Sequence, residues 1–88
     1  MMKIKDGFIL REVAGNYIVV AVGDAVKGFN GVINLNETGA FLWKILEQGA
    51  SEEQLKTALL GEYDVDEDTA KADVTAFVEK LKEKGLLD

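Results

Sequence analysis

The chain has 88 residues, of which 48% are hydrophobic and 30% are charged. These proportions are typical of a folded globular protein, and the length suits one hydrophobic core, so we expect a single domain over residues 1–88. Cysteine and histidine are both absent from the sequence. Their absence excludes disulfides, thiolate nucleophiles, cysteine–zinc sites and catalysis by histidine.

Sixteen acidic residues outnumber ten basic residues and give a formal net charge of −6. A phosphate backbone would be repelled by this charge, so we expect no nucleic-acid partner. No apolar run approaches the roughly 18 residues that span a bilayer, and the N-terminal charges do not follow the pattern of a signal peptide. We therefore expect a cytoplasmic protein with no membrane partner.

The first third of the chain is predicted to form β-strands. Apolar residues dominate 8–14 and 17–22, and Gly15-Asn16 between these segments is typical of a two-residue hairpin turn. That turn pairs Val13 with Ile18 and predicts that the face carrying both side chains faces the core. A loop follows, in which we expect Phe29 to act as an apolar anchor.

A third strand is predicted at residues 32–35, and three amphipathic helices follow it. Asn36, Ser51 and Asp66 are expected to cap the helix N-termini, Ser51 together with Gln54 in a capping box. Apolar residues recur at helical spacing. The expected buried positions are Thr38, Phe41, Leu42, Ile45 and Leu46, then Leu55, Ala58, Leu59 and Tyr63, then Ala70, Val74, Phe77, Val78 and Leu81. The order βββααα predicts an α+β fold of winged-helix type, with a three-stranded antiparallel sheet followed by three helices.

Candidate catalytic and metal-binding groups are few. The carboxylates gather where helices are predicted to begin, and capping accounts for them. The segment 64–68 resembles the start of a calcium loop, but its sixth and twelfth positions are Thr69 and Thr75 instead of glycine and glutamate. We predict no catalytic residue, no metal site and no cofactor. Trp43 is expected either to cover a sheet edge or a neighbouring helix, or to anchor a partner.

The third helix offers two polar flanks beside its buried stripe. One flank carries Lys71, Thr75, Val78 and Lys82, and the other carries Asp73, Phe77, Lys80 and Lys84. Either flank could form one wall of a groove whose other wall is the third strand. An edge strand has unpaired backbone groups, which an extended peptide can satisfy by adding as a further strand.

The segment 31–43, with its run Leu35-Asn36-Glu37-Thr38-Gly39-Ala40, resembles the PqqD family. The family comprises small precursor-peptide recognition elements named for the synthesis of coenzyme PQQ. The resemblance extends from about Lys5 to Leu87 and includes the ending Lys84-Gly85-Leu86-Leu87.

The resemblance implies a non-catalytic adaptor of RiPP biosynthesis. Such a protein binds the leader segment of a ribosomally synthesised precursor peptide and presents it to a modifying enzyme, often a radical SAM enzyme. In the family the leader adds to the third strand, in the groove against the third helix. Since leaders are often acidic, we expect the flank that carries Lys71 and Lys82 to line this groove. The expected peptide-binding residues are Val32, Ile33, Asn34, Leu35, Lys71, Val74, Thr75, Val78 and Lys82.

Other functions stay open at this point. The same fold could serve a DNA-binding winged helix, although that function would require an excess of lysine and arginine on the second or third helix. The chain could also be a structural accessory subunit of an enzyme. An exposed strand edge could in addition pair two copies of the chain into a homodimer.

Overall fold

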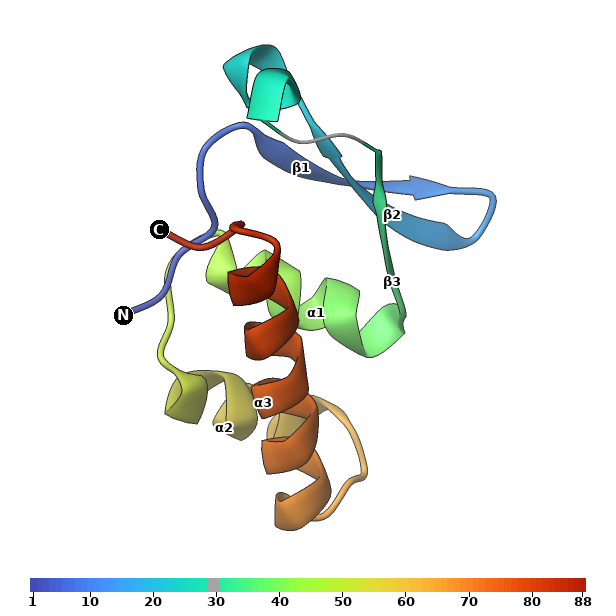
Figure 1. Cartoon of the computed structure of the whole chain (residues 1–88). Coiled ribbons are helices and arrows are strands. Elements are labelled where there is room, and N and C mark those ends of the chain that lie inside the picture. The colour runs from blue at the N-terminus through green and yellow to red at the C-terminus, as the bar shows by residue number, and fades with distance from the viewer. Residues whose placement is uncertain (29–30) are drawn as a thin grey trace.

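The structure is a computed structural model and describes residues 1–28 and 31–88. Within these residues the chain forms an α+β fold of three antiparallel strands and three α-helices, as predicted. The elements are β1 (Phe8–Val13), β2 (Asn16–Ala21), the 3-10 helix η1 (Gly23–Gly28), β3 (Ile33–Leu35), α1 (Glu37–Leu46), α2 (Glu52–Glu62) and α3 (Glu67–Glu83). The strands are ordered β1-β2-β3, and the sheet lies to one side of the three helices (Figure 1). Phe29, the expected anchor, lies outside the described residues.

The hairpin turns one residue earlier than the sequence pattern predicts. Ala14 and Gly15 form the turn with φ angles of 53° and 83°, so Val13 pairs with Asn16. Two successive positive φ angles define a type I′ turn, whose twist matches that of the strands. The predicted register and core face were therefore wrong: Val19 is fully buried, whereas Val13 is 56% exposed.

The three helix starts are confirmed. Asn36 Oδ1 accepts a hydrogen bond from Gly39 N at 2.7 Å, and Asp66 Oδ1 accepts one from the Thr69 amide at 2.7 Å. At α2, Ser51 and Gln54 form the reciprocal bonds of a capping box. Each cap satisfies amides that the first turn of a helix leaves without an internal partner.

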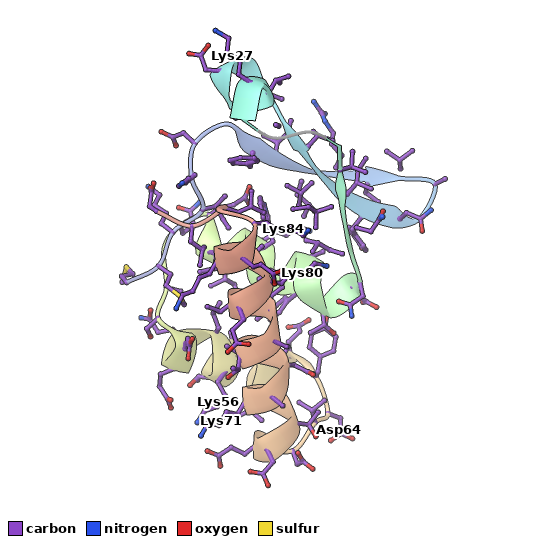
Figure 2. The ribbon with its side chains drawn as sticks, viewed as in Figure 1. Lys27, Lys56, Asp64, Lys71, Lys80 and Lys84 are labelled. Carbon is purple, nitrogen blue, oxygen red and sulfur yellow. The ribbon has the colours of Figure 1, made fainter. Side chains whose placement is uncertain are left out.

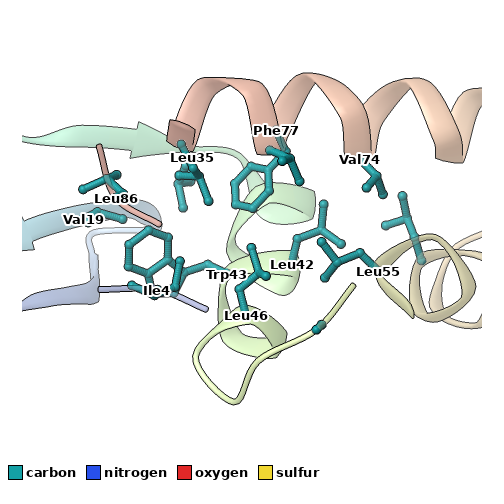
Figure 3. Close-up of a cluster of buried hydrophobic side chains, with 14 of the residues drawn as sticks. Ile4, Val19, Leu35, Leu42, Trp43, Leu46, Leu55, Val74, Phe77 and Leu86 are labelled. Atoms are coloured by element: carbon teal, nitrogen blue, oxygen red, sulfur yellow. The ribbon is translucent and has the colours of Figure 1, made fainter. Parts of the chain in front are cut away.

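The core lies between the sheet and the helices (Figure 3). The predicted inner face of α3 is confirmed, α2 buries Leu55 and Leu59 but leaves Ala58 and Tyr63 partly exposed, and α1 is rotated from its predicted stripe. Trp43 and Leu46 are fully buried, whereas Phe41 and Ile45 are only partly buried. Trp43 packs in the core with residues such as Ile4, so it is not an exposed anchor for a partner.

The two chain ends run side by side (Figure 1). Ile4 forms an isolated β-bridge with Leu87, and Met2 forms another with Ala50, just before α2. The N-terminal segment thereby ties the C-terminus to the start of α2. In the described part of the chain, no helix is both long and apolar enough to cross a membrane.

Candidate functional site

The backbone of Asn34 faces the outer edge of the sheet. A hairpin with a two-residue turn closes on a pair that exchanges both hydrogen bonds, so Asn16 and every second residue after it bond to β1. Tyr17 and Val19 therefore bond to β3, where they pair with its last and first residues. The N–H and C=O of Asn34, the middle residue of β3, consequently point away from β2. Within the described residues, no strand pairs with this side of β3.

A groove of about 390 Å³ lies between this edge and α3. Its apolar walls come from β3, α1 and α3, and the two charged side chains on it come from α3. The lining residues are Asn34, Leu35, Asn36, Thr38, Gly39, Leu42, Asp73, Ala76, Phe77 and Lys80. Phe77 is only 8% exposed and packs beside Leu35 and Leu42, as Figure 3 shows. The groove thus combines unpaired backbone groups with an apolar wall.

Gly39 allows three elements to meet at this groove. A Cβ at this position would lie 3.1 Å from Asn36 Oδ1, 3.4 Å from Leu35 Cβ and 3.5 Å from Phe77 Cε1. The first of these distances is shorter than ordinary van der Waals contact, so a side chain here would push against the cap of α1. Asn36 and Gly39 therefore have physical roles: one starts the helix, and the other lets it approach β3 and α3 closely.

Lys80 connects α3 to the sheet edge. Its Nζ donates a hydrogen bond of 3.3 Å to the carbonyl oxygen of Asn34. This distance is at the long end for a hydrogen bond, and both groups are exposed, so the contact is weak. Lys80 lies on the part of α3 nearer the sheet, whereas Lys56 and Lys71 lie at the other end of the helix bundle (Figure 2).

The residues predicted on the strand are at the groove or next to it. Ile33 and Leu35 are buried and point to the core, and Asn34 presents its backbone to the edge. Val32 is 53% exposed and precedes β3, which begins at Ile33.

The predicted lysine flank of α3 does not face β3. Lys71 and Thr75 line a second groove, of about 260 Å³, on the side of α2. Lys82 is exposed and is not among the residues that line the groove beside β3. Val74 and Val78 are buried in the core at 2% and 0% exposure, so neither side chain is open to a ligand. The prediction that this flank faces β3 is therefore corrected. The opposite flank of α3 faces the strand.

Three of the six charged residues that line the α2 groove pair with one another. Lys56 Nζ lies 3.1 Å from Glu67 Oε1 and 3.4 Å from Glu53 Oε1. The hydrogen bonds that Lys56 donates to these two carboxylates, the one to Glu67 above all, raise the pKa of Lys56. Among the described residues, no group of acidic side chains is arranged to hold a metal ion.

The groove residues missed by the site prediction belong mostly to the second flank of α3. Asp73, Phe77 and Lys80 are spaced by four and three residues and so share one face of the helix. This flank is visible in the sequence, but both flanks carry lysines, so charge does not show which of them faces β3. Thr38 and Gly39 were missed because nothing in the local pattern shows that the first turn of α1 meets α3.

Known proteins resemble this chain in fold and in sequence. The sequence model of the family described as coenzyme PQQ synthesis protein D (PqqD) matches residues 8–87. TbiB1, solved in complex with the TbiA(beta) leader peptide, is 26% identical, with a TM-score of 0.75 over 98% of this chain and 94% of that chain. Lasso peptide synthetase B1, solved with its leader peptide, is 22% identical and shares the fold, with a TM-score of 0.75 over 99% of this chain and 96% of that one.

No curated protein matches the chain significantly. The family match spans almost the whole sequence and includes β3, the start of α1 and all of α3. The elements that form the groove therefore all lie within the part of the chain that matches the family model. The chain belongs to the PqqD family.

Proposed function

We propose that this protein is a leader-peptide-binding adaptor of RiPP biosynthesis. The leader adds as a fourth strand along the outer edge of β3 and places every second side chain in the groove against α3. In this mode of recognition, main-chain hydrogen bonds supply affinity and the pockets for alternate side chains supply specificity. One wall is the segment 32–35, of which Asn34 and Leu35 line the groove, and the other is formed by Phe77 with Asp73, Ala76 and Lys80.

The observation that carries the proposal is the outward-facing backbone of Asn34 beside a groove that mixes apolar and polar side chains. An isolated strand edge would accept many chains, and an isolated groove would bind side chains without ordering a backbone. Here the two features adjoin, since Asn34 and Phe77 line the same groove. An extended peptide is the ligand that satisfies both at once.

The comparisons support this function. TbiB1 binds a leader peptide, and at 26% identity it matches this chain over nearly its whole length. We propose that this protein likewise binds a leader and acts without catalysis, presenting the peptide to a modifying enzyme, such as a radical SAM enzyme. A cytoplasmic location follows from this proposal, because ribosomal peptides are made there.

Asn34→Pro tests the mode of binding. Proline removes the outward N–H and places its ring at the edge, while the bonds to β2, made by Ile33 and Leu35, stay intact. We expect the affinity for the leader segments of short open reading frames beside this gene to fall by about tenfold or more. Isothermal titration measures the change.

Glu12→Pro is the matched control on the opposite edge of the sheet. Glu12 pairs with Tyr17 and is also a residue whose N–H points away from β2. The control should keep its affinity within about twofold, since β1 does not adjoin the groove. Equal losses in both variants, or amide shifts that avoid Ile33 to Leu35 in the titrated wild type, would contradict strand addition to β3.

A further inference from the structure

Lys80 binds the backbone carbonyl oxygen of β3 that an added strand would need as a hydrogen-bond acceptor. Its ammonium donates to the carbonyl oxygen of Asn34, and the backbone direction of β3 makes this oxygen a docking point on the outer edge. A peptide amide that takes the Asn34 oxygen competes with Lys80 for it. The contact is long and exposed, so displacement is easy.

The charge of Lys80 is not otherwise paired. None of the salt bridges in the described part of the chain involves this residue, whereas Lys56 in the α2 groove already has Glu53 and Glu67. A displaced Lys80 therefore keeps a full positive charge on the rim of the groove beside β3. A carboxylate on the bound peptide is the group that can pair with this charge.

The position of such a carboxylate follows from strand geometry. Ile33 and Leu35 are buried on the helix-facing side of the sheet, and Asn34 between them is exposed on the other side. Side chains alternate in the same way along an added strand. The peptide residue opposite Asn34 consequently points away from α3, and its two neighbours point into the groove.

We propose that Lys80 is a specificity-determining residue that selects peptides with an acidic side chain next to the residue opposite Asn34. In the free protein, Lys80 holds the edge carbonyl; in the complex, the peptide amide takes that carbonyl and Lys80 binds the peptide carboxylate. This inference rests on the proposed function, because it requires a strand on β3. It names the substrate class as extended peptides with one acidic groove-facing residue.

The test begins with displayed random peptides of about ten residues, long enough to cover an edge strand. Peptides selected on the wild type are kept if they bind Glu12→Pro but not Asn34→Pro. We expect these peptides to share an Asp or Glu at one position. Selection on Lys80→Glu should replace it with Lys or Arg at the same position.

Synthetic peptides that carry Glu or Gln at that position then measure the coupling. Wild-type protein should prefer Glu by about two- to fivefold, the range of an exposed ion pair. Lys80→Met should lose this preference and bind the Gln peptide at least as tightly as the wild type does, since the Asn34 carbonyl is free. Raising the ionic strength from about 0.05 M to about 0.5 M should also reduce the wild-type preference.

Lys84→Met is the matched control, because Lys84 is an exposed lysine at the same end of α3 but does not line the groove. It should keep the preference for Glu. Selected peptides without a shared acid, or a preference that survives Lys80→Met, would overturn the role of Lys80 and leave strand addition intact. If no peptide distinguishes Asn34→Pro from Glu12→Pro, the proposed function itself fails.

Discussion

Helix α3 borders a groove on each side, and the two grooves differ in what they offer a ligand. On the β3 side, the opposite wall is a sheet edge with an outward-facing backbone at Asn34. On the α2 side, the opposite wall is the start of a helix, and Lys56 there pairs with two carboxylates. The two hollows along one helix thus differ in chemistry, because among the described residues only the groove beside β3 borders the edge of a strand.

The largest expected effect comes from removing the apolar wall of the β3 groove. Phe77→Ala should lower the free energy of unfolding by about 3–5 kcal/mol, since the ring is almost fully buried. Leu59→Ala, on the α2 side, should cost about 2–5 kcal/mol and serves as the matched control. Urea unfolding measures both costs.

Peptide binding separates these two variants. At a temperature where both remain folded, only Phe77→Ala should weaken peptide affinity, because Leu59 lines neither groove. An equal loss of affinity in Leu59→Ala would show that general loosening of the fold, and not the β3 groove, controls binding.

A smaller effect is expected at the start of α1. Asn36→Ala removes the 2.7 Å hydrogen bond to Gly39 N and should cost about 1 kcal/mol of unfolding free energy. Asn36→Asp keeps an oxygen acceptor at the same place, so its stability should stay close to that of the wild type. Thermal unfolding compares the two variants; equal losses would mean that the cap does not stabilise α1.

The helices could be predicted from the sequence because their signals are local. A capping residue and the next few apolar positions lie within two turns, so Ser51 with Gln54 indicates the start of α2 without reference to the rest of the fold. The buried stripe of α3 follows in the same way from its spacing, and each of its predicted residues is buried.

The hairpin register and the groove could not be predicted because they depend on choices that the pattern leaves open. Gly15 can occupy either position of a two-residue turn, and a shift by one residue exchanges the faces of the sheet. Both flanks of α3 carry lysines at helical spacing. The flank that meets β3 depends on how α3 packs against α2 and α1, and no local sequence pattern displays those contacts.

Low pH should weaken the start of α3 while leaving the β3 groove in place. The hydrogen bond from the Thr69 amide lowers the pKa of Asp66 below its usual 3.8. A lowered pKa means that Asp66 stabilises the fold fully above that usual value and loses this contribution as the pH falls through the lower one. Asp66→Ser, which caps without titrating, is the control. The stability of the wild type relative to this control should decrease between about pH 5 and about pH 2, as urea unfolding would show; a constant difference would contradict the assignment.

The smallest expected effect on peptide affinity tests the difference between the two sides of α3 most directly. Reversing both lysines of the α2-facing flank, Lys71→Glu with Lys82→Glu, should change peptide affinity by less than about twofold, since neither residue lines the β3 groove. Lys80→Glu alone, with half the change in charge, should weaken binding of an acidic peptide more than this double variant does. Fluorescence anisotropy of one labelled peptide measures all three proteins under the same conditions. If the double variant binds more weakly than Lys80→Glu, net charge governs recognition and the two sides of α3 do not differ; the reverse order shows that position beside the strand edge decides which lysine a peptide meets.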